Sequence, residues 1–213
     1  MGKFFSYDSP RIRGINKIVD CVLLSFFWLL FSTPIITFGA ATTALYYTVN
    51  KVIRHDRSHV WREFWGAFKA NFKQSTIIWL LVAFLYWLMI GNCILMYNAG
   101  NTVLLILYLV FVALLTMWVI HLFPHIARFE NSTKVILKNC FFLMIRHCGK
   151  TFSVLILLVM AIILFLIWPI LMFILPVAYN FMATLLLEPI YRKYMSEEDL
   201  EAEDERNMVY HDR

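Results

Sequence analysis

The side chains of this chain that could do chemistry are few, and the clearest are two pairs of histidines. His55 and His59, and likewise His121 and His125, stand four residues apart. On a helix this spacing puts both imidazoles on one face, an arrangement that zinc sites use. A metal site also needs a third or fourth ligand, and only Asp56 adjoins the first pair. We therefore expect no metal centre and no bound cofactor.

Two acids stand alone in long apolar stretches, which makes each a candidate site. Asp20 follows Lys17 by three residues and is the candidate intramembrane acid; it forms either an interfacial ion pair, which we favour, or a buried site for a substrate or a proton. Glu188 precedes Arg192 by four residues, the spacing of a helical ion pair. The sequence has no nucleophile elbow, glycine-rich phosphate loop, HExxH or CxxC motif. It therefore predicts a protein that is not an enzyme.

The elements that carry these residues follow from the distribution of charge. The 19 lysines and arginines fall into four clusters, and the stretches between the clusters contain only Asp20 and Glu188 as acids. The bilayer core excludes charge, and short basic loops stay on the cytoplasmic side. Each stretch should therefore cross the membrane and return. This places all four clusters, and both the N and C termini, in the cytoplasm.

The chain is thus expected to be an all-α, polytopic helical membrane protein with about six membrane segments. One crossing of the hydrocarbon core takes roughly 20 helical residues. The second segment has little room and should be short, tilted or re-entrant. The segments form a single integral membrane domain over residues 1–195, and residues 196–213 follow as an acidic, solvated and mobile cytoplasmic tail. The expected segments are 14–32, 36–53, 76–97, 102–123, 151–168 and 170–188.

Composition supports the class and limits the partners. The chain is 61% hydrophobic, more than one soluble core of this size could bury, so lipid must cover the excess. The formal net charge of +5 is explained by this topology and by attraction to anionic inner-leaflet lipids. Membrane lipids are therefore expected partners, and no nucleic acid is.

A break separates the first two segments. Pro34 ends the first helix, because proline has no amide hydrogen to continue it, and Thr37 can cap the next one. The small residues that follow are spaced for close contact between helix backbones, which is the interpretation that we favour. The alternative is that this turn lines a path for a substrate or an ion. The residues that would pack or line the path are Pro34, Thr37, Gly39, Ala40, Thr43 and Ala44.

Two linkers between segments are amphipathic. In residues 60–73, Trp61 and Trp65 belong to an aromatic stripe, and Lys69 and Lys73 lie on the other side of the helix. This pattern predicts a helix lying in the membrane interface, and these four residues are the candidate partner contacts. Residues 131–147 form a second linker with a looser stripe.

Several strings in the N-terminal third carry a family resemblance. They are Phe4–Pro10, Ser32–Tyr46 and Asn71–Ser75, with Trp28 and Trp79. These strings resemble the YesL family of small integral membrane proteins from Gram-positive bacteria, which are usually described without a molecular function. The resemblance implies a protein of the bacterial cytoplasmic membrane, often encoded beside ABC sugar importers. It brings no catalytic or binding residues with it.

Two hypotheses of different class follow for the function. The first is an accessory or scaffold component of a bacterial carbohydrate uptake system of the ABC type, with importer subunits or a homo-oligomer as partners. The second is an autonomous transporter or channel for small solutes, which uses the Thr33–Thr43 break and Asp20. We favour the first, because a sugar carrier should place several polar ligands near the midplane and this sequence shows few.

Overall fold

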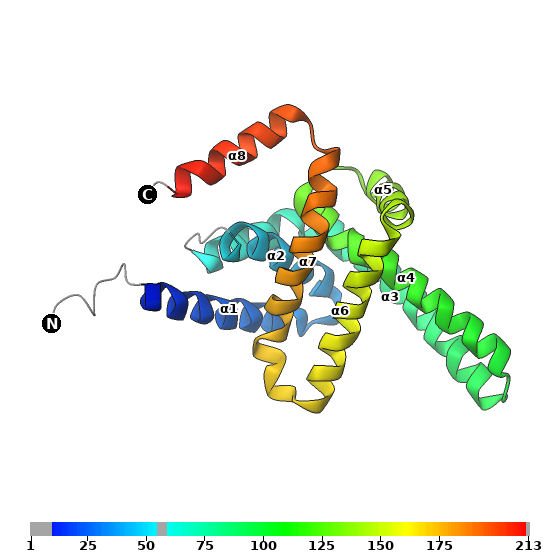
Figure 1. Cartoon of the computed structure of the whole chain (residues 1–213). Helices are drawn as coiled ribbons and strands as arrows, with labels where there is room; N and C mark the ends of the chain where they lie inside the picture. Colours follow the sequence, from blue (N-terminus) through cyan, green and yellow to red (C-terminus); the bar gives the residue numbers. More distant parts are fainter. Residues whose placement is uncertain (1–9, 55–58, 212–213) are drawn as a thin grey trace.

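The computed structural model describes residues 10–54 and 59–211, and this part of the chain is entirely helical (Figure 1). The expected all-α class is confirmed for these residues. His55 and Asp56, from one expected histidine cluster, lie outside them. The helices and turns, in chain order, are α1 (Pro10–Ser32), η1 (Ile35–Thr37), α2 (Phe38–Thr48), η2 (Val49–Ile53), α3 (Val60–Asn98), α4 (Thr102–Arg128), α5 (Thr133–Arg146), α6 (Cys148–Ile167), η3 (Pro169–Phe173), α7 (Leu175–Tyr191), η4 (Arg192–Tyr194) and α8 (Glu197–His211).

Three helices, α3, α4 and α6, are long and apolar enough to cross a membrane. They carry the expected segments 76–97, 102–123 and 151–168. The other three expected segments fall on α1, on α2 with the π-helical turn η2, and on α7. With 11 residues, α2 is shorter than a helical crossing requires. Whether these three helices cross, and on which side the termini lie, stay predictions.

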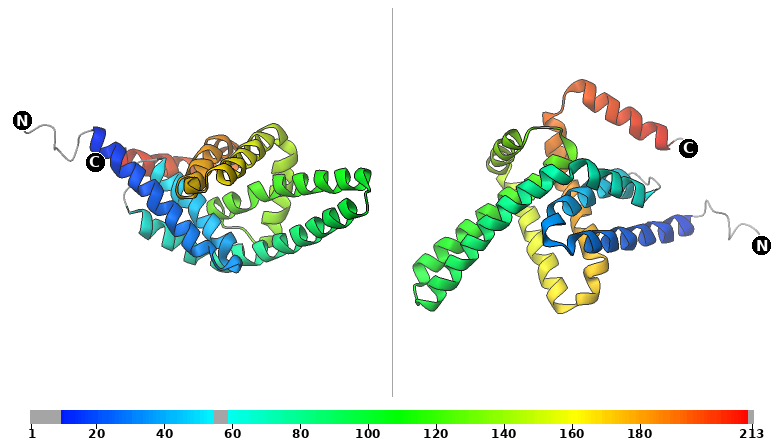
Figure 2. Two further views of the ribbon diagram at one scale, coloured as in Figure 1. Left: turned by 90° about the horizontal axis from the view of Figure 1, so that it is seen from below. Right: turned by 180° about the vertical axis from the view of Figure 1, so that it is seen from behind.

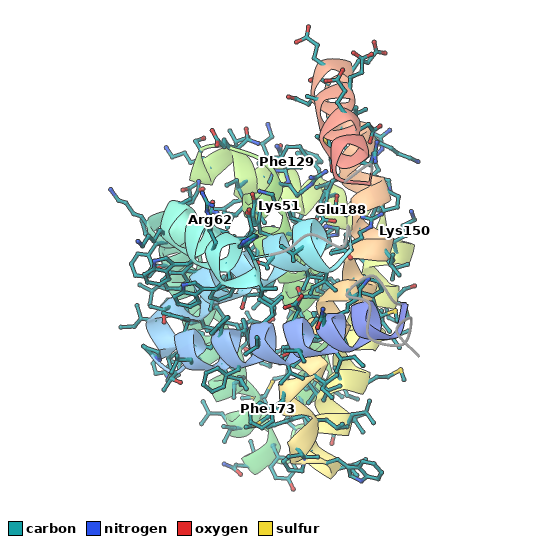
Figure 3. The ribbon with its side chains drawn as sticks, turned by 90° about the vertical axis from the view of Figure 1, so that its left-hand side faces the viewer. Lys51, Arg62, Phe129, Lys150, Phe173 and Glu188 are labelled. Carbon is teal, nitrogen blue, oxygen red and sulfur yellow. The ribbon has the colours of Figure 1, made fainter. Side chains whose placement is uncertain are left out.

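The long helices form two hairpins that diverge from each other (Figures 1 and 2). In Figure 1, α3 and α4 run together away from the rest of the protein, and α6 and α7 form a second hairpin. Helix α1 lies crosswise to α6 and α7 in all three ribbon views (Figures 1 and 2). Helices α5 and α8 lie at the end opposite the hairpin tips. Figure 3 shows Lys51, Arg62, Lys150 and Glu188 toward this end, which we call the charged end, and Phe173 toward the tips.

The α3–α4 hairpin ends in a short turn whose geometry follows from its sequence. Gly100 has a positive φ of 68°, which glycine adopts without steric cost. The Asn101 side chain accepts a hydrogen bond from the Leu104 amide at 3.1 Å and so caps α4. Near the turn, large side chains are open to the surroundings: Tyr97 is 73% exposed and Val103 is 78% exposed. An apolar surface of this kind suits contact with lipid.

Residues 60–97 differ from the sequence-based expectation. The interfacial linker 60–73 and the segment 76–97 were expected as separate elements, and the structure has them in one helix of 39 residues. No proline lies between Val60 and Asn98, so nothing in the sequence forces the helix to stop. The second linker does form a separate helix, α5, which a short turn at His147 joins to α6.

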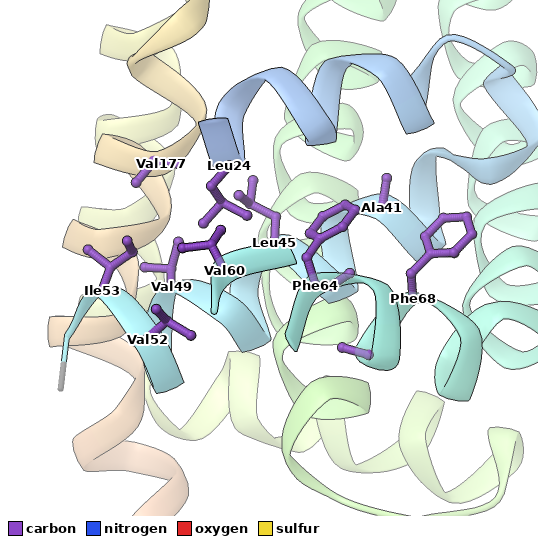
Figure 4. Close-up of a cluster of buried hydrophobic side chains, with 13 residues drawn as sticks. Leu24, Ala41, Leu45, Val49, Val52, Ile53, Val60, Phe64, Phe68 and Val177 are labelled. Atoms are coloured by element: carbon purple, nitrogen blue, oxygen red, sulfur yellow. The ribbon is translucent and has the colours of Figure 1, made fainter. Parts of the chain in front are cut away.

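The largest core cluster joins α1, α2, η2 and the first turns of α3 (Figure 4). Leu24 of α1 and Phe64 of α3 are fully buried in it, and Val177 of α7 closes one side. Phe31 adds an aromatic contact with Phe68, with ring centroids 5.1 Å apart. Burying a side chain of this size contributes about 1.5–3 kcal/mol. This cluster therefore fixes the break between α1 and α2 against α3.

Candidate functional site

The most unusual feature of the charged end is a buried ion pair between α4 and α7. Arg128 Nη2 lies 3.1 Å from Glu188 Oε2, and the two side chains are 14% and 2% exposed. Tyr46 of α2 donates a hydrogen bond from its hydroxyl to Glu188 Oε1 at 2.9 Å. Removing a charge from water costs several kcal/mol unless it is paired and hydrogen-bonded. The pair therefore holds three separate helices in one arrangement.

The acidic tail adds a second carboxylate to the same guanidinium. Glu203 of α8 accepts hydrogen bonds from Arg128 Nη1 at 3.2 Å and from Nη2 at 2.9 Å. The adjacent Asp204 accepts from Arg192 Nη2, with both carboxylate oxygens at 2.8 Å. The tail, expected to be mobile, is thus a helix whose acids contact the ends of α4 and α7. Glu188, whose spacing favoured Arg192, pairs with Arg128 instead.

A polar cavity of about 1040 Å³ lies beside this network. Its walls come from α2, η2, the first half of α3, the end of α4 and the loop that follows, and Glu203 of α8 reaches into it. The charged residues in the wall include Lys51 and Glu63, which pair with each other at 2.8 Å. The uncharged polar residues in the wall are Tyr47, Asn50, Asn71, Gln74 and Asn131. A cavity of this size and polarity is large enough to hold a small polar molecule.

A second cavity, of about 540 Å³, is mostly apolar. It lies among α1, α2, α3, α4, α6 and α7, and its wall includes Trp28, Trp79 and Phe165. Two of its polar groups satisfy each other, because the Tyr86 hydroxyl lies 2.8 Å from the Thr116 hydroxyl. Its lining therefore suits a hydrocarbon group better than a charged one.

The two buried histidines of α4, His121 and His125, differ in their hydrogen bonding. His121 is fully buried, and its ring nitrogens lie 3.2 Å from the Tyr191 hydroxyl and 2.8 Å from the Thr151 hydroxyl. His125 packs its ring on Phe129 with centroids 4.7 Å apart, and neither of its nitrogens has a partner among the described residues. Within that part of the chain, no three metal-ligating side chains come together. His121 therefore links α4 to α6 and α7 through hydrogen bonds.

A further histidine, His147, lies among positively charged side chains at the charged end. His147, in the turn between α5 and α6, lies 3.1 Å from the Tyr194 hydroxyl through its Nε2. Desolvation, and then the positive charges of Lys193, Arg146 and Lys150, lower the pKa of His147 from its ordinary value. The imidazole is therefore neutral at neutral pH and can accept or donate within this contact.

The residues of the expected break lie against α3. A Cβ built on Gly39 would lie 2.6 Å from the Ser75 carbonyl oxygen and 2.6 Å from Trp79 Cβ, so the two backbones are in close contact. Ala40, Thr43 and Ala44 are fully buried in the same region. The Thr43 hydroxyl lies 2.9 Å from the Ser75 hydroxyl. These contacts are those of a packed helix interface.

Thr37 and Trp79 fix the turn itself. Thr37 stands at the N-cap position, directly before α2, but its hydroxyl makes no capping bond; it donates to the Phe31 carbonyl oxygen at 2.6 Å instead. The Trp79 indole N–H donates to the Ile35 carbonyl at 2.6 Å. The Phe31 carbonyl, near the end of α1, is thereby satisfied by a side chain, and the Ile35 carbonyl accepts from Trp79 in addition to the Phe38 amide.

The candidate partner contacts lie on the first turns of α3. Lys69 and Lys73 are exposed, and Trp61 is 46% exposed. The Lys69 ammonium lies 4.7 Å from the centre of the Trp65 ring, a cation–π contact. Lys69 therefore lies beside the aromatic stripe, whereas the sequence had placed it on the other side of the helix. Asp20 is half-buried on α1 and does not line either cavity. The structure therefore separates Asp20 from both the break and the polar cavity.

The sequence did not point to Arg128 and Tyr46 as site residues. Arg128 belongs to a basic cluster and Tyr46 to an apolar helix, so neither stands out. The available signal was Glu188 itself, since an acid in an apolar stretch requires a cation somewhere in the fold. Helical spacing pointed to Arg192 as the partner of Glu188, but the partner in the structure is Arg128, from a helix distant in sequence.

The comparisons with known proteins cover the same region as the break. Residues 21–93 match a family model, described as "Protein of unknown function, DUF624". The matched stretch starts in α1, passes through the break and α2, and ends in α3. No curated protein and no solved structure matches the chain. The match therefore includes Gly39, Ser75 and Trp79, but not Arg128 or Glu188.

Proposed function

We propose that this chain is a non-enzymatic integral membrane protein that acts as an accessory or scaffold component of a bacterial carbohydrate uptake system of the ABC type. The support for this setting is the resemblance of residues 4–79 to YesL proteins; the family model that matches residues 21–93 is described as one of unknown function and assigns no role. In this proposal the charged end faces the cytoplasm, both termini are cytoplasmic, and about six segments lie in the bacterial cytoplasmic membrane. Its partners are membrane lipids and subunits of the importer.

One surface carries the proposal: the basic and aromatic face at the start of α3, which we call the α3 face. Trp61, Phe72, Lys69 and Lys73 are exposed on it. Aromatic side chains supply apolar contact area at interfaces, and lysines give charge complementarity with an acidic partner. Within the face, Trp65 stacks on Trp61 with ring centroids 5.6 Å apart. A face that combines aromatic and basic side chains suits a docking role.

No contact favours the transporter alternative to the same degree. Gly39 and Thr43 of the Thr33–Thr43 break pack on α3, Phe38 and Thr42 of the same stretch line the mostly apolar cavity, and Asp20 lies away from both cavities. A path for a solute would need these groups to meet around an open space. The accessory role therefore accounts for more of the fold.

Charge reversal on the α3 face tests the proposal. The double variant Lys69→Glu, Lys73→Glu is expected to reduce co-purification with the importer's permease subunits by about tenfold, because two attractive charges become repulsive. The measurement is affinity purification of the tagged protein from its native membrane in mild detergent, followed by quantitative mass spectrometry.

The matched control makes the same change on α5. Lys134 and Lys138 are also exposed, so Lys134→Glu, Lys138→Glu changes the net charge equally at another place. This control should retain the permease subunits. Undiminished association of the α3 variant would remove the α3 face from the proposal, and a wild-type protein that purifies alone would remove the importer.

A further inference from the structure

The polar cavity at the charged end contains an internal carboxylate in the position of a ligand. Glu203 projects from α8 into the wall of the cavity, where Arg128 also lies. Its two oxygens meet two different nitrogens of the guanidinium, at 3.2 Å and 2.9 Å. This two-point geometry is how arginine recognises carboxylate and phosphate groups of ligands. The Glu203 carboxylate therefore occupies a position that a ligand oxyanion fits.

The rest of the wall suits a molecule with hydroxyl groups. Four carboxamides line it, and a carboxamide carries both donors and an acceptor, which is what a hydroxyl group needs. These residues are Asn50, Asn71, Gln74 and Asn131. Asn50 Oδ1 already accepts from Arg54 at 3.2 Å and Asn71 Nδ2 donates to the Ala67 carbonyl at 3.0 Å, so these two side chains keep only part of that capacity for a ligand. Gln74 already donates to the Asn131 carbonyl at 2.7 Å, so the far side of the wall is fixed in place.

The charge balance of the wall allows one anion to replace another but leaves no positive charge for an additional one. Lys51 and Glu63 neutralise each other across the wall, and Glu188 pairs with Arg128 from behind. Glu130 is the remaining acid of the wall. Arg128 is therefore the point where a ligand oxyanion would bind, and the Glu203 carboxylate is the one it must replace.

Helix α8 is held in a way that allows this replacement. None of its residues from 197 to 205 is buried. Its other tie, between Asp204 and Arg192, joins side chains that are 46% and 39% exposed, and exposed pairs of this kind contribute little. Of the two ion pairs described for residues 197–205, the one between Glu203 and Arg128 is therefore the less exposed and the stronger.

We propose that this cavity binds a small hydroxylated anion, whose phosphate or carboxylate group replaces the Glu203 carboxylate on Arg128 and releases α8. The acidic tail is then an internal competitor for the site. Ligand binding in the cavity therefore causes α8 to move at the protein surface. This inference does not rest on the accessory role, because it concerns only contacts within the chain.

The experiment measures binding by the purified full-length protein in phosphatidylcholine nanodiscs. Glucose 6-phosphate and gluconate are the probes, and glucose, which has hydroxyl groups but no charge, is the comparison. Isothermal titration calorimetry should show saturable binding of at least one anion and none of glucose. Hydrogen exchange of the α8 amides in residues 197–205 should rise when that anion is added, because α8 leaves its docked position.

The decisive variant removes the competitor and keeps its shape. Glu203→Gln should bind the same anion about tenfold more tightly, since loss of one charge-assisted contact corresponds to roughly that factor. Glu201→Gln removes the same charge from an exposed position of the same helix and should bind as the wild type does. Equal affinities for wild type and Glu203→Gln, absence of binding by both anions, or equally tight binding of glucose would each overturn the proposal.

A lipid headgroup could supply the same oxyanion, so nanodiscs containing phosphatidylglycerol form the second arm. Binding of the soluble anion in both kinds of nanodisc supports a soluble ligand. If phosphatidylglycerol alone raises α8 exchange and the soluble anion then adds nothing, the oxyanion belongs to the lipid and the soluble ligand is excluded.

Discussion

Replacing Arg128 by methionine is expected to destabilise the protein by about 3–5 kcal/mol, the usual cost of leaving one member of a buried ion pair alone. Methionine keeps much of the apolar stem, so the main loss is the positive charge beside Glu188, whose side chain is 2% exposed. The Tyr46 hydroxyl would then be the carboxylate's remaining strong partner in this contact. Unfolding in SDS, followed by circular dichroism, measures the free energy.

Two further variants separate the charge from the packing. Arg192→Met removes an arginine from an ion pair whose side chains are 39% and 46% exposed, and is expected to cost less than about 1 kcal/mol. Arg128→Met combined with Glu188→Gln should recover most of the lost stability, since the amide is neutral and still accepts from Tyr46. A double variant as unstable as Arg128→Met would show that the charge of Glu188 is not the cause.

The sequence predicted the end of α1, the end of α3 and the start of α4 because charge, proline and turn residues act locally, but it did not predict that α3 begins at Val60 or that α4 continues to Arg128. Arg128 and Lys150 bound apolar stretches that a membrane helix can use, and Pro34 interrupts α1 through its own missing amide hydrogen. The α3–α4 turn at Asn98–Asn101 could be predicted from a short stretch of polar residues that contains a glycine. Each of these features depends on a few neighbouring residues, so the sequence alone carries them.

Contacts between distant helices could not be predicted in the same way. The pairing of Glu188 with Arg128 depends on how α4 and α7 cross, whereas helical spacing predicted Arg192 as the partner. The tail shows the same limit: its acids indicated solvation, but Glu203 and Asp204 meet arginines that the fold brings beneath them. Polar cavities form in the same manner, from groups that no single segment contains.

The small residues of the break were predicted only in part. Their spacing predicted close helix packing, but it did not show which helix they would pack against. Gly39→Ala is expected to destabilise the protein by about 1–3 kcal/mol, because extra atoms in a filled interface force the backbones apart. The added Cβ would lie 2.6 Å from the Ser75 carbonyl oxygen, a backbone atom that cannot rotate away. The same SDS unfolding measurement applies.

Gly66→Ala is the matched control on α3. Nothing lies within 4 Å of a Cβ at Gly66, so alanine there should stabilise the helix by about 0.5–1 kcal/mol through its higher helix propensity. Opposite signs at the two glycines would place the loss at the α2–α3 contact and not in the glycine replacement itself. Unchanged stability of Gly39→Ala would mean that α2 can move away from Ser75, as a turn that opens for a solute requires, and the transporter alternative would regain its basis.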